Sequence, residues 1–366
     1  MNAILPVILV ACALVGSVAW WLTLASRPDL RRELWPAFRF RRVPWGAADV
    51  LGAFVLVLLM AGLPWDQWLF QAVSNPYDHR SAAIDAPPLN LPGRGEDRRS
   101  VAPRSDNVAN QDASQVPSEP HETARKISES DQKRSHGLWI LLQNRPTFAM
   151  FFLCFLVAVV AAPVMEETLF RLLLQGWLAT REWQIRRWLN NSRRWSRRRG
   201  AESLSLAHSQ RFGIVSVLVV AVCFSLIHFR STSDVPSADS ILAIMLRQLF
   251  GYGAAWPLLV LWLTLGRGVR LGTWGLARET FWPDVVLGLR WFATLAVPIY
   301  GLQVGLSAIT PDSVVVDPLT LFPFGLVSGV LCLRTGRLLP AIVFHMALNG
   351  TSLALAAMLL LSGGFS

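Results

Sequence analysis

The sequence predicts an all-α fold, a polytopic bundle of about eight transmembrane helices. Of the 366 residues, 53% are hydrophobic and only 16% are charged, which is too apolar a balance for an ordinary soluble enzyme. Near-continuous apolar runs recur along most of the chain, and roughly 20 such residues form a helix that crosses a hydrocarbon layer of about 30 Å. Short clusters of basic residues flank these runs, as they do in the loops of membrane proteins.

The N-terminal region, residues 1–72, contains the first two predicted helices, at residues 4–24 and 50–70. The loop between them is rich in arginine and is therefore predicted to be cytoplasmic, which places the N-terminus outside. A cleaved signal peptide is an alternative because Ala25 and Ser26 are small. Cleavage would, however, leave the arginines on the wrong side of the membrane.

Residues 73–136 are predicted to form a disordered external loop. Proline, serine, aspartate, asparagine and arginine dominate this stretch, aromatic residues nearly vanish, and no apolar periodicity survives. Basic and acidic residues are nearly balanced, which suits an external position that the positive-inside rule does not govern. We assign no chemistry to this loop.

Residues 137–366 are predicted to be the core of the protein. A long apolar helix begins near Phe148, continues past Pro163 to about Ala179, and leads into an arginine-rich loop that is predicted to be cytoplasmic. Five further spans are expected at residues 212–229, 241–265, 284–308, 319–333 and 338–361. The loops that join them alternate between acidic and basic residues, so every turn agrees with one orientation in which both termini lie outside.

The formal net charge of +10 does not indicate a nucleic-acid-binding protein, because the basic residues lie beside apolar runs and set their orientation. Membrane lipid is the expected partner, and an acidic lipid surface is one form of it. The four cysteines lie in apolar segments without a paired spacing, and we expect them to be packing residues: Cys12, Cys154, Cys223 and Cys332.

A pair of glutamates lies midway along the long predicted helix. An ionisable side chain within a bilayer costs about 2.5–3.5 kcal/mol on insertion scales, so such residues are candidates for function. Glu167 and Arg171 are four residues apart and share a face, so they can pair, whereas Glu166 lies about 100° around the helix. A buried ion pair that only stabilises the bundle is the alternative interpretation.

Two further polar groups lie in other predicted spans. His228 is at the far end of the fourth span, and His345 shares a face of the last span with Asn349. Each of them alone could be an interhelical hydrogen bond. By the helical rise, Glu166 and His228 lie roughly 22 Å and 25 Å from the cytoplasmic ends of their helices. His345 would be only about 12 Å deep, unless the turn before it is sunk below the surface.

These residues, in this order on separate helices, closely resemble the motifs of the CAAX prenyl endopeptidase and bacteriocin-processing family, known also as the CPBP or ABI family. The family pattern is E-E-x-x-x-R, then F-x-x-x-H, then H-x-x-x-N or D. The residues of this chain that match it are Glu166, Glu167, Arg171, Phe224, His228, His345 and Asn349. The resemblance covers roughly residues 145–361 and leaves residues 1–136 without an assigned role.

The resemblance implies an intramembrane endopeptidase that hydrolyses a peptide bond in a membrane-associated protein or peptide, for which a prenylated C-a-a-X tail is one candidate. It implies that Glu166 is the general base, which activates a water with help from His228. His345 and Asn349 would donate hydrogen bonds to the oxyanion. Glu167 and Arg171 would orient the site.

No cofactor is expected. An older interpretation of the family makes Glu166, His228 and His345 ligands of Zn²⁺, and three protein ligands with an open position would suit metal-dependent hydrolysis. We favour metal-free catalysis because the chain has no H-E-x-x-H helix.

Two other classes of function remain open. A non-catalytic membrane scaffold or immunity-type protein could keep the same fold, and a proton-coupled transporter could use the buried glutamate and histidines as a relay. The absence of a strong internal repeat counts against the transporter. We expect the protein in the plasma membrane of a bacterium.

Overall fold

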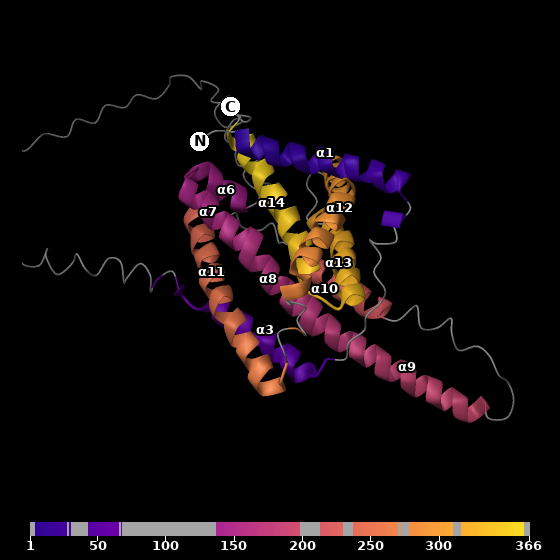
Figure 1. Cartoon of the computed structure of the whole chain (residues 1–366). Helices are drawn as coiled ribbons and strands as arrows, with labels where there is room; N and C mark the ends of the chain where they lie inside the picture. Colours follow the sequence, from indigo (N-terminus) through magenta and orange to yellow (C-terminus); the bar gives the residue numbers. More distant parts are fainter. Residues whose placement is uncertain are drawn as a thin grey trace, which may run out of the picture. The chain divides into compact units, whose positions relative to one another are not determined.

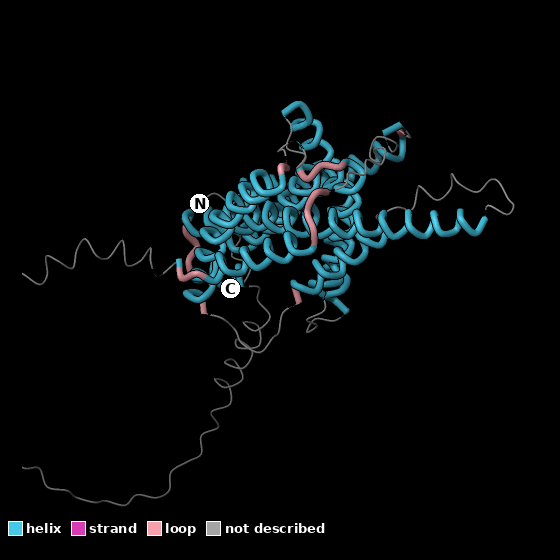
Figure 2. The backbone as a smooth tube through the Cα atoms, turned by 90° about the horizontal axis from the view of Figure 1, so that it is seen from below, coloured by secondary structure: helices cyan, strands magenta, loops and turns pink. Residues whose placement is uncertain are grey.

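The computed structural model describes residues 4–27, 29–30, 43–65, 67, 137–197, 213–229, 237–269, 272, 278–309 and 316–361. Every regular element in these ranges is a helix, so the predicted all-α class is confirmed (Figures 1 and 2). The helices named below belong to one compact unit, Met1–Trp65 together with Arg134–Ser366. The loop predicted at residues 73–136 lies outside the described residues, so its disorder stays a prediction.

Each predicted span overlaps a helix, although the ends differ. Besides the long central helix, these are α1 (Ile4–Ser26), α3 (Ala47–Gly62), α10 (Ile214–Ile227), α11 (Ala238–Leu261), α12 (Phe281–Ile309), α13 (Val316–Thr335) and α14 (Leu339–Leu361). Five helices are long and apolar enough to cross a membrane, and three shorter apolar helices accompany them among the described residues. The chain is therefore an integral membrane protein with about the predicted number of helices. A short helix that the sequence did not predict, α6 (Gly137–Asn144), precedes the long one.

One continuous helix carries the glutamate pair. It consists of α7 (Phe148–Cys154), η1 (Phe155–Ala161), α8 (Ala162–Glu167), η2 (Thr168–Gln175) and α9 (Gly176–Arg197). The segments η1 and η2 are π-helical, and wide turns of this kind often occur at functional sites. The wide turns of η1 lead into Pro163, which has no backbone N–H to donate to the preceding turn. The glutamate pair thus ends α8 between two widened segments.

Glycines allow the helices around this pair to approach closely. A Cβ atom on Gly288 of α12 would lie 2.7 Å from the carbonyl oxygen of Pro340, at the start of α14. A Cβ atom on Gly325 of α13 would lie 3.2 Å from the Cα atom of Ala221 in α10. Since α13 also packs on α14, the three helices α10, α13 and α14 form one tightly packed group.

The two N-terminal helices are built into the same bundle. On α1, the indole Nε1 of Trp20 donates to Thr294 Oγ1 of α12 at 2.8 Å. On α3, Asp49 Oδ1 lies 2.7 Å from Arg267 Nη2, just after η4 (Trp262–Gly266), the π-helical segment that continues α11. Asp49 is only 2% exposed and the Arg267 side chain is 44% exposed, so this ion pair joins the buried start of α3 to the segment after α11 near the surface. Residues outside the predicted core therefore support it.

Candidate active site

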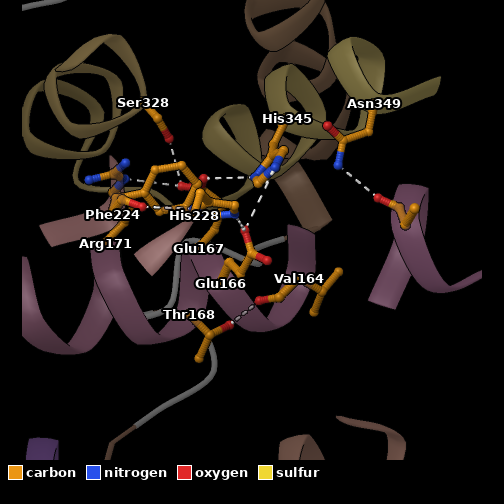
Figure 3. Close-up of polar contacts among 11 residues, drawn as sticks. Val164, Glu166, Glu167, Thr168, Arg171, Phe224, His228, Ser328, His345 and Asn349 are labelled. Carbon is orange, nitrogen blue, oxygen red and sulfur yellow. Dashed lines mark hydrogen bonds and ion pairs between the residues drawn. The ribbon is translucent and has the colours of Figure 1, made fainter. Parts of the chain in front are cut away.

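Glu167 is the most extensively bonded side chain of the candidate site (Figure 3). Its Oε1 atom lies 3.1 Å from His345 Nδ1, and its Oε2 atom accepts a hydrogen bond of 2.6 Å from Ser328 Oγ. Arg171 Nε lies 3.4 Å from the same Oε2 atom, which confirms the predicted pairing along the helix. The Glu167 and Arg171 side chains are both fully buried. A buried carboxylate persists only when it is paired and hydrogen-bonded in this way.

The contact with Glu167 determines which ring nitrogen of His345 donates a hydrogen bond and which one faces Glu166. Glu167 is paired with Arg171 and accepts from Ser328, as an ionised carboxylate does, so His345 Nδ1 must donate to it. The other ring nitrogen, Nε2, then points at Glu166, with 3.9 Å between Nε2 and Glu166 Oε2. The second glutamate thereby orients an imidazole toward the first.

His228 reaches Glu166 from the end of α10. The helix ends at Ile227, and the His228 ring folds back so that Nδ1 lies 2.8 Å from the carbonyl oxygen of Phe224. A carbonyl oxygen only accepts, so Nδ1 of His228 carries the proton. Its Nε2 atom lies 3.9 Å from Glu166 Oε2, the same oxygen that His345 faces. Two imidazoles with oriented rings therefore converge on one carboxylate oxygen.

Glu166 is more accessible to solvent than Glu167. Its side chain is 19% exposed, whereas the Glu167 side chain is fully buried. The two separations of 3.9 Å are too long for direct hydrogen bonds but suit a water that bridges two acceptors. The carboxylate and the lone pair of His228 Nε2 can together polarise such a water.

Aromatic rings pack around the two imidazoles. The Phe224 ring centroid lies 4.7 Å from that of His228 and 6.0 Å from that of His345. Phe324 packs against His345 from another direction, with the ring centroids 4.6 Å apart and the planes at 62°. Both phenyl rings are fully buried. This apolar wall strengthens electrostatic interactions inside the site and limits the rotation of the imidazoles.

The described hydrogen bond of Asn349 goes to a residue outside the cluster that the other predicted site residues form. It lies one turn after His345 on α14, but its Nδ2 atom donates to the carbonyl oxygen of Ala158 in η1 at 2.7 Å (Figure 3). That bond joins α14 to the widened segment ahead of the glutamates. The structure brings together the other five predicted residues, and the oxyanion role of Asn349 stays a prediction.

Sequence reasoning missed Ser328, which is fully buried on α13 and donates to Glu167. A serine in an apolar helix carries no signal by itself, because it commonly donates to its own backbone. The available clue is its setting. Gly325 and Gly329 lie on the same side of α13 and face Arg171 and Gln175 of η2. This side of α13 therefore has small residues where it packs against polar side chains of the long helix.

The spacing of these side chains does not decide the zinc alternative. Within the described ranges, no group of three or more histidine, cysteine, aspartate or glutamate side chains could hold a metal ion. Bonds of about 2.0–2.1 Å around a tetrahedral zinc place ligand atoms roughly 3.4 Å apart. The two nitrogen-to-oxygen separations here are wider, at 3.9 Å. Metal dependence therefore stays a prediction that biochemistry must test.

Comparison with known proteins assigns the larger part of the chain to a family. Residues 148–351 match the family described as type II CAAX prenyl endopeptidase Rce1-like. This range includes all six predicted site residues and leaves α1, α3 and α6 outside. No curated protein and no solved structure matches the chain. The resemblance expected from the three motifs is confirmed, and the chain belongs to the type II CAAX prenyl endopeptidase Rce1-like family.

Proposed function

We propose that the protein is an intramembrane endopeptidase in which Glu166 activates the attacking water. The observation that carries this proposal is the convergence of His228 Nε2 and His345 Nε2 on a single oxygen of a partly exposed carboxylate, each at 3.9 Å. Such an arrangement can hold a water and remove its proton. An ion pair that only stabilised the bundle would not need two imidazoles oriented toward the unpaired glutamate.

In the proposed reaction, a water lies between Glu166 Oε2 and His228 Nε2. Glu166 takes a proton as the water oxygen attacks the carbonyl carbon of the scissile peptide bond, and the carbonyl oxygen becomes an oxyanion. Glu166 then returns the proton to the amide nitrogen, and the carbon–nitrogen bond breaks. His228 donates Nδ1–H to Phe224, so its Nε2 atom is available to accept from the water.

His345 is the proposed donor to the oxyanion. Its Nδ1–H is committed to Glu167, so Nε2 must also carry a proton when the oxyanion forms. The charges nearby favour that state: Glu166 and Glu167 contribute two negative charges, and Arg171 contributes one positive charge. A protonated His345 makes the cluster neutral, which is the less costly arrangement within a bilayer.

The proposed substrate is a protein or peptide held at the membrane, with a prenylated C-a-a-X tail as the first candidate. The family description names this substrate class. We propose catalysis without a metal ion, because the chain has no H-E-x-x-H helix, and we propose the plasma membrane of a bacterium as the location.

The test is cleavage of a farnesylated C-a-a-X peptide by purified protein in liposomes, with products identified by mass spectrometry. We expect wild-type protein to release the tripeptide in the presence of a zinc chelator. We expect Glu166→Gln to be inactive and the matched control Glu279→Gln, an exposed glutamate ahead of α12, to be fully active. Full activity of Glu166→Gln would overturn the mechanism, and loss of activity with the chelator would restore the zinc alternative.

A further inference from the structure

A short segment before α3 packs against the part of the long helix that follows the glutamates. Residues 43–46 are not helical, and the Trp45 side chain among them is only 4% exposed. Its indole Nε1 donates to the carbonyl oxygen of Leu173 in η2 at 3.1 Å, in the interior of the bundle. The segment lies outside the region that matches the family, and the proposed reaction does not involve it.

The surroundings of Trp45 differ from those of a tryptophan that anchors a protein at the membrane surface. Such a tryptophan keeps its indole N–H at the level of the headgroups, in contact with water. The N–H of Trp45 instead reaches a buried backbone carbonyl. A helix carbonyl normally accepts from its own helix, so a donor from outside marks a place where the helix is irregular.

The long helix changes from π to α turns at this place. In η2, which ends at Gln175, N–H groups donate to carbonyls five residues earlier, and in α9, which begins at Gly176, to carbonyls four residues earlier. By this count, the change passes over one carbonyl. The Leu173 carbonyl accepts the Gly176 N–H across a tight turn and the Trp45 N–H from outside the helix. Trp45 therefore stabilises the wide turns where they end.

The 43–46 segment is held at both of its ends. The N–H of its first residue donates to Thr180 Oγ1 of α9 at 3.4 Å, and the N–H of its last residue donates to Asp49 Oδ2 of α3 at 2.8 Å. Gly176 has no side chain where the segment crosses the long helix, and this allows the close approach of Trp45. The position of the indole is thus determined by two helices.

The wide turns that Trp45 contacts also carry a residue that orients the site. Arg171 lies two residues before Leu173, and its Nε atom is 3.4 Å from Glu167 Oε2. Glu167 in turn accepts from His345 Nδ1 at 3.1 Å. Because π and α turns differ in the angle between successive residues, loss of the wide turns would rotate Arg171 about the helix axis and away from this carboxylate.

We propose that Trp45 is a positioning residue of the peptidase site. Its hydrogen bond to Leu173 keeps the π turns of η2, and these turns hold Arg171 against Glu167. The inference rests on the proposed function, because the rate that it predicts is that of peptide cleavage. If Trp45 only filled space, an aromatic ring without the N–H would serve as well.

The test compares Trp45→Phe with Trp20→Phe in the full chain in liposomes. Phenylalanine keeps an aromatic ring but has no N–H to donate. Trp20 is the matched control, because it also lies in the N-terminal region and donates its Nε1 at 2.8 Å, but to Thr294 of α12. Two quantities are measured: kcat and KM for cleavage, and the imidazole NMR signal of the protonated Nδ1 of His345, which is identified by its loss in His345→Asn.

We expect Trp45→Phe to lower kcat by roughly 3- to 10-fold, the contribution of one neutral hydrogen bond, with KM unchanged. It should also shift the His345 signal, whereas Trp20→Phe should change neither quantity. An unchanged His345 signal in Trp45→Phe, or an unchanged kcat beside an active wild-type protein, would overturn the proposal. If the wild-type protein cleaves no peptide, the proposed function fails, and the His345 signal still decides whether Trp45 positions the cluster.

Gly176→Ala is a second variant that leaves Trp45 in place. The new Cβ atom would lie 3.1 Å from Val43 Cγ1 and 3.3 Å from Trp45 Cζ2, so the segment must move by a few tenths of an ångström. Alanine favours a helix more than glycine does, yet we expect this change to shift the His345 signal and lower kcat. The control is Gly253→Ala, whose Cβ atom would have nothing within 4 Å. Equal results for the two alanine variants would contradict the proposal.

Discussion

At the scale of single residues, the two neighbouring glutamates have opposite surroundings. Glu167 is fully buried and contacts His345, Ser328 and Arg171, so its charge is fixed by the fold. Glu166 is partly exposed and faces two imidazole nitrogens at 3.9 Å. The buried carboxylate orients the site and the accessible one is free to react, although they are adjacent in sequence.

Ser328→Ala should lower kcat and leave KM nearly unchanged. A hydrogen bond to a charged group contributes about 1.5–3 kcal/mol, so loss of the bond to Glu167 predicts a decrease of roughly 10- to 100-fold. The matched control is Ser225→Ala. Ser225 is also buried but donates to the carbonyl oxygen of Ala221 in its own helix, and its replacement should leave kcat within about two-fold. Equal rates for the two variants would show that Ser328 does not position Glu167.

These two serines also show the limit of prediction from sequence. The ionisable residues could be found because charge is costly in an apolar helix, and Glu167 with Arg171 could be paired from their spacing. Ser225 and Ser328 look alike in sequence, and only the packing of α13 against η2 distinguishes them. Helical spacing likewise places Asn349 on the face of His345, but only the fold shows that it reaches Ala158.

At the scale of elements, α3 supports the site from outside the region that matches the family. Its Phe54 ring packs edge-to-face on Phe170 of η2, with centroids 5.4 Å apart. Phe170 packs in the same way on Phe224 at 5.5 Å, and Phe224 contacts the imidazole of His228. This column of rings links a helix of the N-terminal region to an imidazole of the site.

Phe54→Ala should destabilise the protein by about 2–3 kcal/mol and lower its cleavage rate, because it leaves a cavity against Phe170. Thermal unfolding in detergent and the peptide assay measure the two effects. The next residue provides the control. Val55 is 45% exposed, and Val55→Ala should change both quantities little. If Phe54→Ala behaves like Val55→Ala, α3 is a passive neighbour of the core.

The boundaries of α3 show why element ends are harder to predict than their existence. The span was predicted at residues 50–70, whereas the helix covers Ala47–Gly62. Its end has a local cause: Leu63 has extended backbone angles, as the residue before Pro64 is inclined to have. Its start depends on Asp49, whose carboxylate accepts from the Gly46 N–H and also pairs with Arg267. The partner in that pair is more than 200 residues away in sequence.

At the scale of the whole molecule, the predicted orientation assigns each connecting segment of the bundle to one side of the membrane. Arginine-rich segments on one side of the bundle are expected to be cytoplasmic, and the acidic loops are expected to be external. The helices α1 and α3 contact the family-matching helices through Trp20 and Asp49, so the bundle includes the N-terminal region. A charge rule applied to sequence alone thus predicts an orientation but not these contacts.

The topology can be tested by labelling exposed positions on opposite sides. In a cysteine-free variant, Asp239→Cys is predicted to be external and Arg278→Cys cytoplasmic, since the sequence predicts an acidic connection before α11 and a basic one before α12. A membrane-impermeant thiol reagent should label position 239 in intact cells, and position 278 only after the cells are permeabilised. Labelling in the reverse order would show that the bundle is inverted.

The central claim is that Glu166 and His228 act as a unit on one water. The most direct measurement is kcat for Glu166→Gln, His228→Asn and the double variant, with wild-type protein, all at equal amounts in liposomes. Each single change should lower kcat by about 10²- to 10⁴-fold. The double variant should be no slower than the slower single variant, because removing either residue already removes the contribution that the two make together. Losses that multiply, or a single variant with wild-type kcat, would contradict the claim.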